Sequence, residues 1–389
     1  MKRRQFLNLM GTLPLAALAP ASILSAPAAS AATGNRVLVL VELFGGNDGL
    51  NTVIPYADPL YRKFRPNLAI QPDQIIKIDP KIGLHPSMRP IVPLWRNGEL
   101  AIALGVGYPA PIFSHFRGIK VWDSASDRDG ASRRGWITRV LEENDGFMGR
   151  FKASGVMLGR NHLGPLESPG HMALTMNDVF DFPELPDGPV PAPSKIANPA
   201  LDHIANVQNR LDRSFHASAR NLLRSTAPGA TFPGHGLGRQ FQSVARLIAG
   251  GFPVPVYKLS LEGFDGHANH SNFHSRLLAE MAEAFSAFAQ AMKFHGLWDQ
   301  VLVMTYAEFG RRVAENGSLG TDHGTAAPHF LFGGRVRGGF YGAQPGLDNL
   351  NAGNLTHTVH FRELYASVIN EWWHINSSFI GERGLKIID

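Results

Sequence analysis

Five short runs of apolar residues limit the architecture of this chain more than any other feature. Residues 37–41 read Val-Leu-Val-Leu-Val, without the alternating polar residues of a strand that has one face in water. Such a strand belongs in a parallel sheet that is covered by helices on both faces. The other runs follow at residues 100–104, 254–261, 301–305 and 330–332.

Helical segments separate these runs. From Ser271 to about His295 the apolar residues recur at the helical period, and Gly296 supplies an end. A helix is expected to open in the Ser-His-Phe-Arg segment at 114–117, and a final one to cover about 361–373. This alternation predicts an α/β fold, a doubly wound, mostly parallel sheet sandwiched by helices. In such sheets ligands bind at the carboxyl ends of the strands.

Acidic residues and histidines gather where those strands are expected to end. Three acids each come just after an apolar run, and two acids have a histidine beside or two residues after them, with glycine nearby. Carboxylate and imidazole suit zinc, manganese or another borderline divalent metal. An Asp near a His is also a common structural pair, so each pair alone is ambiguous. The residues are Asp48, Asp265, His267, Glu308, Asp322 and His323.

Composition removes several classes of site. The chain has no cysteine, which excludes disulfides, thiolate metal ligands and a cysteine nucleophile. With 389 residues, 44% of them hydrophobic, it is long enough to bury a large core in one large α/β domain or two ordinary ones.

The first 31 residues have the form of an export signal. A positive head, Lys-Arg-Arg-Gln-Phe-Leu at 2–7, precedes an apolar stretch and a run of small residues that ends Ala-Ser-Ala at 29–31. The arginine pair before x-Phe-Leu is similar to the consensus of the twin-arginine translocase, which exports folded cargo. An ordinary Sec signal is the alternative. We therefore expect cleavage after Ala31 and a periplasmic or secreted protein.

Residues 32–389 are then expected to form a single domain. Loss of Lys2, Arg3 and Arg4 with the signal lowers the formal net charge from +5 to +2, which argues against nucleic acid or an anionic membrane as a partner. No other segment is long and apolar enough to span a bilayer. The proline-rich stretch at about 163–199 has little periodicity and is interpreted as a surface excursion that covers a site.

Five motifs occur in an order that resembles one exported bacterial family, called "domain of unknown function 1501". That family is similar to the alkaline phosphatase and sulfatase superfamily, a doubly wound sandwich with a two-metal hydrolytic centre. The similarity spans most of the chain after the signal. The motifs are Phe-Gly-Gly-Asn-Asp-Gly-Leu-Asn at 44–51, Ser-His-Phe at 114–116, Phe-Asp-Gly-His at 264–267, Glu-Phe-Gly-Arg at 308–311 and Gly-Thr-Asp-His-Gly at 320–324.

The resemblance implies a divalent metal centre of one or two ions, zinc or manganese. Asp265 and His267 would hold one metal, and His323 would be the final metal-binding histidine. Asp48 and Glu308 would be strand-end ligands. Superfamily phosphatases usually carry Asp-His where this chain has Glu-Phe, so Asp322 would have to replace the missing ligand.

The resemblance also implies catalytic residues. Ser114 would be the nucleophile at a helix N-terminus, where free N–H groups attract an anion. Arg117 or Arg311 would clamp a phosphate. Ser114 lacks the Pro of the formylglycine signature, and Arg117 follows it too early, which excludes that class of sulfatase. The plainer interpretations are a helix cap for Ser114 and turn chemistry for Asp48.

The remaining histidines are interpreted as structural. His85, His115 and His329 fall in this group, and His270 is taken mainly as a neighbour of a ligand. Together these features predict an exported metal-dependent hydrolase of phosphate or related anionic esters, acting on a small or polymeric substrate. The alternative is a non-catalytic exported binding protein that keeps the fold and a degenerate metal site.

Overall fold

The computed structural model describes residues 36–126, 132, 134–149, 151, 153–168, 173–176 and 228–389. The expected export signal and most of the proline-rich stretch lie outside these residues. The described residues all belong to one compact unit, Asn35–Asp389. Among them, no helix is both long and apolar enough to cross a membrane.

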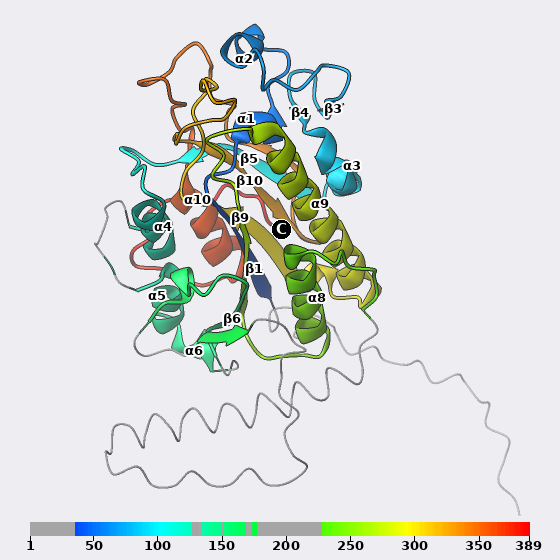
Figure 1. The fold of residues 1–389 in the computed structure, drawn as a ribbon. Helices are drawn as coiled ribbons and strands as arrows, with labels where there is room; N and C mark the ends of the chain where they lie inside the picture. Colours follow the sequence, from blue (N-terminus) through cyan, green and yellow to red (C-terminus); the bar gives the residue numbers. More distant parts are fainter. Residues whose placement is uncertain are drawn as a thin grey trace, which may run out of the picture. The chain divides into compact units, whose positions relative to one another are not determined.

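Strand β1 (Val37–Phe44) lies inside a nine-stranded sheet (Figure 1). It pairs in parallel with β8 (Val256–Glu262) on one side and β9 (Val301–Tyr306) on the other. The predicted mostly parallel sheet is confirmed, with β10 (Ala327–Phe332) as the antiparallel strand between β9 and β5 (Leu100–Gly107). The remaining strands are β6 (Gly155–Leu158) and β7 (Ala173–Met176) beyond β8, and β11 (Gly339–Tyr341) and β12 (Val359–His360) on β5.

Helices cover both faces of this sheet, as the apolar runs require. Alternate residues of β1 face opposite layers: Val39 and Val41 join one core and Leu38 and Leu40 the other. Complete burial of such side chains stabilises the fold by roughly 1.5–3 kcal/mol each. The first core packs under α8 (Gly236–Ala249), α9 (His270–Phe294), η1 (Pro86–Ile91) and α3 (Val92–Arg96). The second packs under α4 (His115–Ser124), α5 (Trp136–Glu142), α10 (Phe361–Ala366) and the π-helical η5 (Ser367–Trp372).

A smaller layer lies beyond the ends of the central strands. There β2 (Val53–Ile54), β4 (Gly83–Leu84) and β3 (Ile76–Lys77) form a three-stranded sheet. The short helices α1 (Gly49–Thr52) and α2 (Pro59–Phe64) lie nearby at the top of Figure 1. The other short elements are α6 (Asp145–Met148), η2 (Gly164–Leu166) and η4 (Trp298–Gln300).

Two local details differ from the sequence-based expectations. Helix α9 begins at His270, and its cap is Asn269 in the left-handed region rather than Ser271. The stretch from residue 163 is not irregular throughout, because η2 and the edge strand β7 lie in it. The rest of that stretch, including its prolines from 183 onward, lies outside the described residues.

Candidate metal centre

The carboxyl ends of β1, β8 and β9 bring three loops to one edge of the sheet. Phe44 at the end of β1 is in register with Glu262 at the end of β8, so the loops that follow lie side by side. Gly45 makes this approach possible, because its φ is +112° and a Cβ there would be 2.4 Å from the backbone nitrogen of Asp265. The Gly45 N–H donates to Glu308 Oε1 at 2.8 Å, which joins the loops after β1 and β9.

Three histidines present Nε2 to one carboxylate oxygen of Asp265. The distances to Asp265 Oδ1 are 3.3 Å from His115, 3.0 Å from His267 and 3.3 Å from His323. The Nε2 atoms of His267 and His323 are themselves 3.0 Å apart. Ligand atoms of His115, Asp265 and His323 all lie within 4.8 Å of one another, close enough to bind one ion. The side chain of Asp265 is 47% exposed, so the cluster is open to solvent.

Each of these imidazoles has an oxygen at its other nitrogen. Nδ1 of His115 lies 2.6 Å from Glu308 Oε1, Nδ1 of His267 lies 3.3 Å from Asp322 Oδ1, and Nδ1 of His323 lies 2.8 Å from the Phe113 carbonyl. Carboxylate and carbonyl oxygens accept, so these contacts place the proton of a neutral ring on Nδ1 and leave the lone pair on Nε2. This arrangement, imidazole to metal and Nδ1–H to an oxygen, is typical of metal-binding histidines.

The donor atoms fit a divalent cation. With the ring protons on Nδ1, three Nε2 lone pairs face the Asp265 carboxylate, whose charge Arg311 balances, and a cation among the three nitrogens would relieve their mutual repulsion. Nε2 of His115 is buried and has no hydrogen-bond partner. A set of imidazoles and one carboxylate suits zinc or manganese. Within the part of the chain that the structure describes, this is the one group of at least three such side chains placed to share an ion.

Arg311 does not have the substrate-clamping role expected from the motif. Its side chain is fully buried, and its Nη2 donates to Asp265 Oδ1 at 2.7 Å. The other N–H groups donate to backbone carbonyls, among them those of Gly46 and Thr321, at 2.9 Å each. Burial raises the pKa of Asp265, but the hydrogen bond and charge of Arg311 outweigh it and lower that pKa to about 2. Arg311 therefore fixes the loops and keeps Asp265 ionised.

Asp48 does not join the cluster as expected. Its carboxylate is completely buried, with Oδ2 2.6 Å from Arg65 Nη1 and 3.0 Å from His270 Nε2. Burial raises the pKa of Asp48, but the Arg65 charge and the His270 contact hold it well below its usual value. A buried cation, Arg65, is already paired with this carboxylate, so Asp48 lies apart from the cluster at Asp265.

Glu308 and Asp322 lie behind the histidines rather than among the ligand atoms. Glu308 is buried and orients His115, whereas Asp322 is 54% exposed and faces His267. Asn316 Nδ2 donates to Asp322 Oδ1 at 3.1 Å, and this hydrogen bond is the main cause of the lowered pKa of Asp322. Both carboxylates therefore lie against Nδ1 of an imidazole and apart from the Asp265 oxygen on which the Nε2 atoms converge.

Residues at the start of α4 complete the site. Ser114 is the N-cap residue of α4, but its side chain makes no capping hydrogen bond. Its hydroxyl is thus not used in the way that the plainer interpretation proposed. Arg117 is exposed one turn into the helix. The neighbouring His115, expected to be structural, is in the cluster. The sequence signal that could have identified His115 is its position directly after Ser114, in the segment that follows β5. The functional role was assigned to the Ser114 hydroxyl instead.

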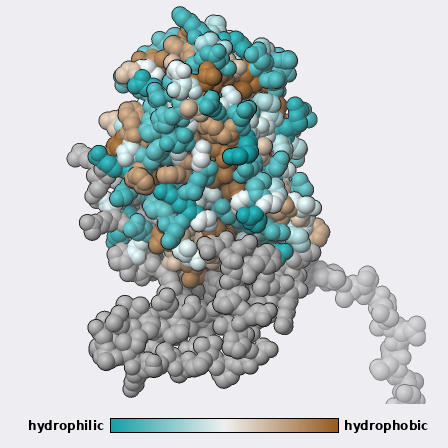
Figure 2. All heavy atoms as spheres, viewed as in Figure 1, coloured by the Kyte–Doolittle hydropathy of each residue, from teal (hydrophilic) through white to brown (hydrophobic). Residues whose placement is uncertain are grey.

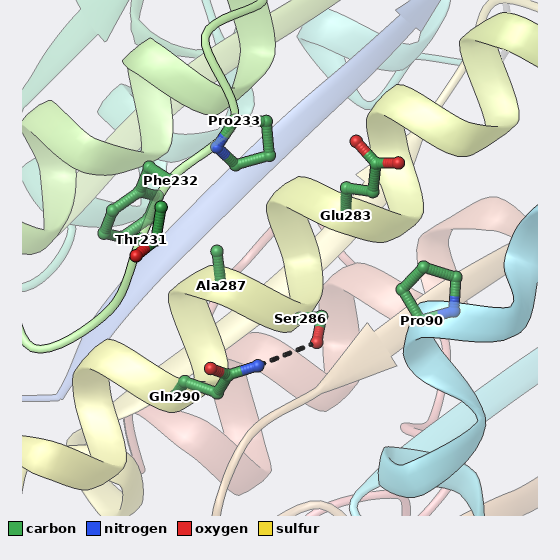
Figure 3. Close-up of a pocket in the computed structure, with 8 residues that line it drawn as sticks. All are labelled: Pro90, Thr231, Phe232, Pro233, Glu283, Ser286, Ala287 and Gln290. Atoms are coloured by element: carbon green, nitrogen blue, oxygen red, sulfur yellow. Dashed lines mark hydrogen bonds between the residues drawn. The ribbon is translucent and has the colours of Figure 1, made fainter.

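A separate cavity of about 350 Å³ lies on the other helical layer (Figure 3). Its walls come from α9, η1 and the segment before α8, and its polar groups include Glu283 and the hydrogen-bonded pair Gln290 and Ser286. None of the clustered histidines lines it, so we place the chemistry at Asp265. The lining residues are Pro90, Thr231, Phe232, Pro233, Glu283, Ser286, Ala287 and Gln290.

Comparison with protein families supports the resemblance drawn from the motifs. Residues 218–372 match the family described as "Protein of unknown function (DUF1501)". The match includes the motifs around Asp265, Glu308 and His323 and covers less than half of the chain. None of the curated proteins has a sequence that matches this one.

Solved structures with a similar backbone include a synthase and a sulfatase. The lipoteichoic acid synthase LtaP from Listeria monocytogenes has 11% identity and a TM-score of 0.39, over 91% of this chain and 75% of that one. The PsFucS1 sulfatase from Pseudoalteromonas sp. has 10% identity and a TM-score of 0.37, over 93% and 75%. The periplasmic domain of EcEptC from Escherichia coli, in complex with Zn, has 9% identity and a TM-score of 0.33, over 77% and 74%. Similarity this low carries no function over to this chain.

Proposed function

We propose that this chain is an exported hydrolase of phosphate or related anionic esters that uses a single divalent ion, zinc or manganese. The ligands would be Asp265 and Nε2 of His115, His267 and His323. The observation that supports this proposal most is the convergence of three imidazole lone pairs on one ionised carboxylate, with each Nδ1 against an oxygen. A divalent ion would accept the three Nε2 lone pairs, which Arg311 at Asp265 does not reach.

The surrounding residues have defined tasks in this proposal. A bound divalent ion would supply Lewis-acid polarisation of the ester and stabilise the charge that develops as it is cleaved. Glu308 holds the proton on Nδ1 of His115, and Arg311 keeps the Asp265 carboxylate ionised. Ser114, at the N-terminus of α4, would attack the phosphorus or sulfur atom as the bond to the leaving alcohol breaks, and the serine proton would pass to that alcohol's oxygen. Water would then hydrolyse the serine ester and release phosphate or sulfate. Direct attack by water is the alternative.

One observation favours the second candidate, a binding protein with a degenerate site. Both aspartates that follow strand ends form ion pairs with arginines: Asp48 with Arg65, and Asp265 with Arg311. A cation bound at Asp265 would share that carboxylate with a fixed guanidinium, which lowers its affinity. If the affinity is too low for the exported protein to retain a metal, the fold would serve binding alone.

Metal analysis separates the two candidates. We expect the purified protein to retain about one equivalent of zinc or manganese, and Asp265→Asn and His115→Ala to lose it while remaining folded. His295→Ala is the matched control, because His295 lies at the other end of α9 from the centre. A folded wild-type protein that takes up no zinc at micromolar concentration would exclude the enzyme proposal.

Activity then tests the nucleophile. With aryl phosphates and aryl sulfates, Ser114→Ala should lose at least about 100-fold in kcat while its metal content stays unchanged. Retained activity in this variant would show that water attacks directly. If no ester is hydrolysed by protein that holds its metal, the hydrolase proposal fails although the metal site stands.

A further inference from the structure

Exposed apolar side chains surround the candidate metal centre. The described residues include four large hydrophobic side chains that are well exposed: Phe113 at 46%, Phe116 at 70%, Phe294 at 65% and Leu319 at 45%. Three of these four lie in the loops or helix turn that position the clustered histidines, and the fourth is at the far end of α9. Exposed large apolar groups that gather at one place on a surface mark binding sites. We call Phe113, Phe116 and Leu319 the apolar rim.

Two members of the rim come from the start of α4. The Phe113 carbonyl is the oxygen that faces Nδ1 of His323 at 2.8 Å, so Phe113 belongs to the support of the centre itself. Phe116 directly follows His115 on the first turn of α4. Figure 2 shows brown, apolar residues scattered within the hydrophilic surface of the face in view. Phe113 and Phe116 thus flank Ser114 and His115 in the chain at the start of α4.

Leu319 approaches from the opposite loop in a strained conformation. Its φ is +56°, a region that is costly for a bulky L-residue and natural for Gly or Asn. Hydrogen bonds hold it there: the His270 N–H donates to the Leu319 carbonyl at 2.9 Å, and Leu319 N–H to the Asn316 carbonyl at 3.2 Å. The next residue, Gly320, lies against the backbone of His267, 2.2 Å from where a Cβ would be.

Both the backbone conformation and the exposure of Leu319 are unfavourable for leucine. A glycine or asparagine would fit the left-handed backbone at lower cost, and a polar residue would suit the exposure. Leu319 is one of seven described non-glycine residues with a positive φ, and the only large hydrophobic one that is well exposed among the described residues. Strained residues that the surrounding structure holds in place are found at functional sites. The side chain at 319 is therefore available to contact a ligand.

We infer that the substrate of the centre is an anionic ester with an apolar aryl or alkyl group, which packs on Phe113, Phe116 and Leu319 while the ester group lies at Asp265 and the histidines. This inference rests on the proposed function for the position of the ester group. It adds a substrate class, because a rim of charged or polar residues would instead select sugars or small polar esters. Burial of each methylene on the rim should tighten binding by roughly two- to fourfold.

Equilibrium binding tests this inference independently of turnover. Titration calorimetry on zinc-loaded protein would compare methyl, butyl and hexyl phosphate. We expect affinity to rise by at least about 20-fold from methyl to hexyl, and Phe116→Ala and Leu319→Asn each to lower the hexyl affinity several-fold with little effect on methyl phosphate. Phe294→Ala, which removes an equally exposed ring at the far end of α9, should change neither.

The outcomes keep the two proposals apart. Chain-length dependence that the rim variants remove supports the inference even if no ester is hydrolysed, in which case the hydrolase proposal alone fails. Equal affinity for methyl and hexyl phosphate overturns the inference even if both are hydrolysed. Phosphatidylcholine vesicles that bind the wild type but not Phe116→Ala, with no preference among the phosphates, would also overturn it and assign the rim to a lipid surface. Leu319→Asn is further expected to be at least as stable as the wild type, so a loss of binding in it cannot be a loss of fold.

Discussion

Two clusters at the same edge of the sheet contain the same residue types and differ in almost every physical respect. The exposed cluster has Asp265, Arg311 and the three histidines around them. The buried cluster has Asp48, Arg65 and His270, and its side chains are 0% exposed. Composition alone would assign both to a metal or both to structure. The difference is in which atoms face each other.

In the buried cluster the charges are compensated by groups of the fold. Arg65 donates to Asp48 and also to the carbonyls of Arg312 and Val313, at 2.9 Å each, so it connects α2 to the loop after β9. His270 stacks on His274 with their ring centroids 4.5 Å apart. Burial, together with the nearby His270, holds the pKa of His274 well below its usual value, and the ring is neutral. The Asp48 charge is thus balanced by Arg65, although Asp48 Oδ1 and both ring nitrogens of His270 are buried without a hydrogen-bond partner.

In the exposed cluster the Nε2 atoms of three histidines face a single carboxylate, Asp265, which already has its arginine. Nε2 of His115 remains without a partner although it is buried. The comparison teaches that exposure and lone-pair direction, more than residue type, separate a ligand set from a structural ion pair.

Replacement of Arg65 by methionine should cause the largest loss. It leaves the Asp48 carboxylate buried without its cation, and removal of one partner of a buried pair costs about 3–5 kcal/mol. We expect urea unfolding to show a destabilisation of that size or failure to fold. Arg312→Ala is the control, because it keeps the backbone carbonyl that Arg65 uses and removes only an exposed side chain. If Arg65→Met lowers the free energy of unfolding by less than 1 kcal/mol, the ion pair in the buried cluster is not structural in the way proposed here.

Most of the fold could be predicted from the sequence because buried strands carry a strong local signal. The apolar runs at 37–41, 100–104, 254–261, 301–305 and 330–332 all lie in strands of the sheet. The short strands β6, β7, β11 and β12 and the three-stranded sheet were not predicted. They are two to four residues long, and segments of that length have no periodicity to detect.

The site could be predicted only in part, because pairing partners that are distant in sequence leave no local pattern. Asp265, His267 and His323 were expected together and do lie together. Arg65 had no signal, since its pair with Asp48 depends on how α2 packs. His115 was assigned a structural role because a single histidine near a helix start is ambiguous until a carboxylate such as Glu308 is seen at its Nδ1.

Glu308→Gln should produce the next largest effect, now on the exposed cluster. Gln keeps an oxygen for the Gly45 N–H but loses the charge that holds the proton on Nδ1 of His115. Loss of such an orienting carboxylate lowers metal affinity by about 10- to 100-fold. Competition with a chromogenic zinc chelator would measure this. Zinc affinity equal to that of the wild type would show that His115 is not a ligand.

His85, the buried N-cap residue of η1, should make the stability of the fold depend on pH. Burial lowers its pKa to about 4, so between pH 6.5 and 4 the unfolded chain binds a proton that the folded chain does not. Stability therefore falls as the pH drops through this window, by roughly 2 kcal/mol at pH 5 relative to pH 7.

His85→Asn isolates this contribution. Asn keeps an acceptor for the Ser87 N–H at the start of η1 and cannot titrate. Urea unfolding at both pH values, with a chelator present to exclude metal effects, should show a shallower pH dependence in the variant. The same slope in both proteins would mean that other groups, such as His274 and His329, carry the dependence.

The smallest effect is expected for Asp322→Asn, and it tests the comparison most finely. Asp322 faces His267 as Glu308 faces His115, but its side chain is 54% exposed against 0% for Glu308. Exposed charged pairs contribute about 0.2–1 kcal/mol, so zinc affinity should fall only about two- to fivefold, and less at high salt. Asn also retains an oxygen for Nδ1 of His267. A loss larger than that of Glu308→Gln would mean that Asp322 binds the ion directly, because solvent could not then replace its charge.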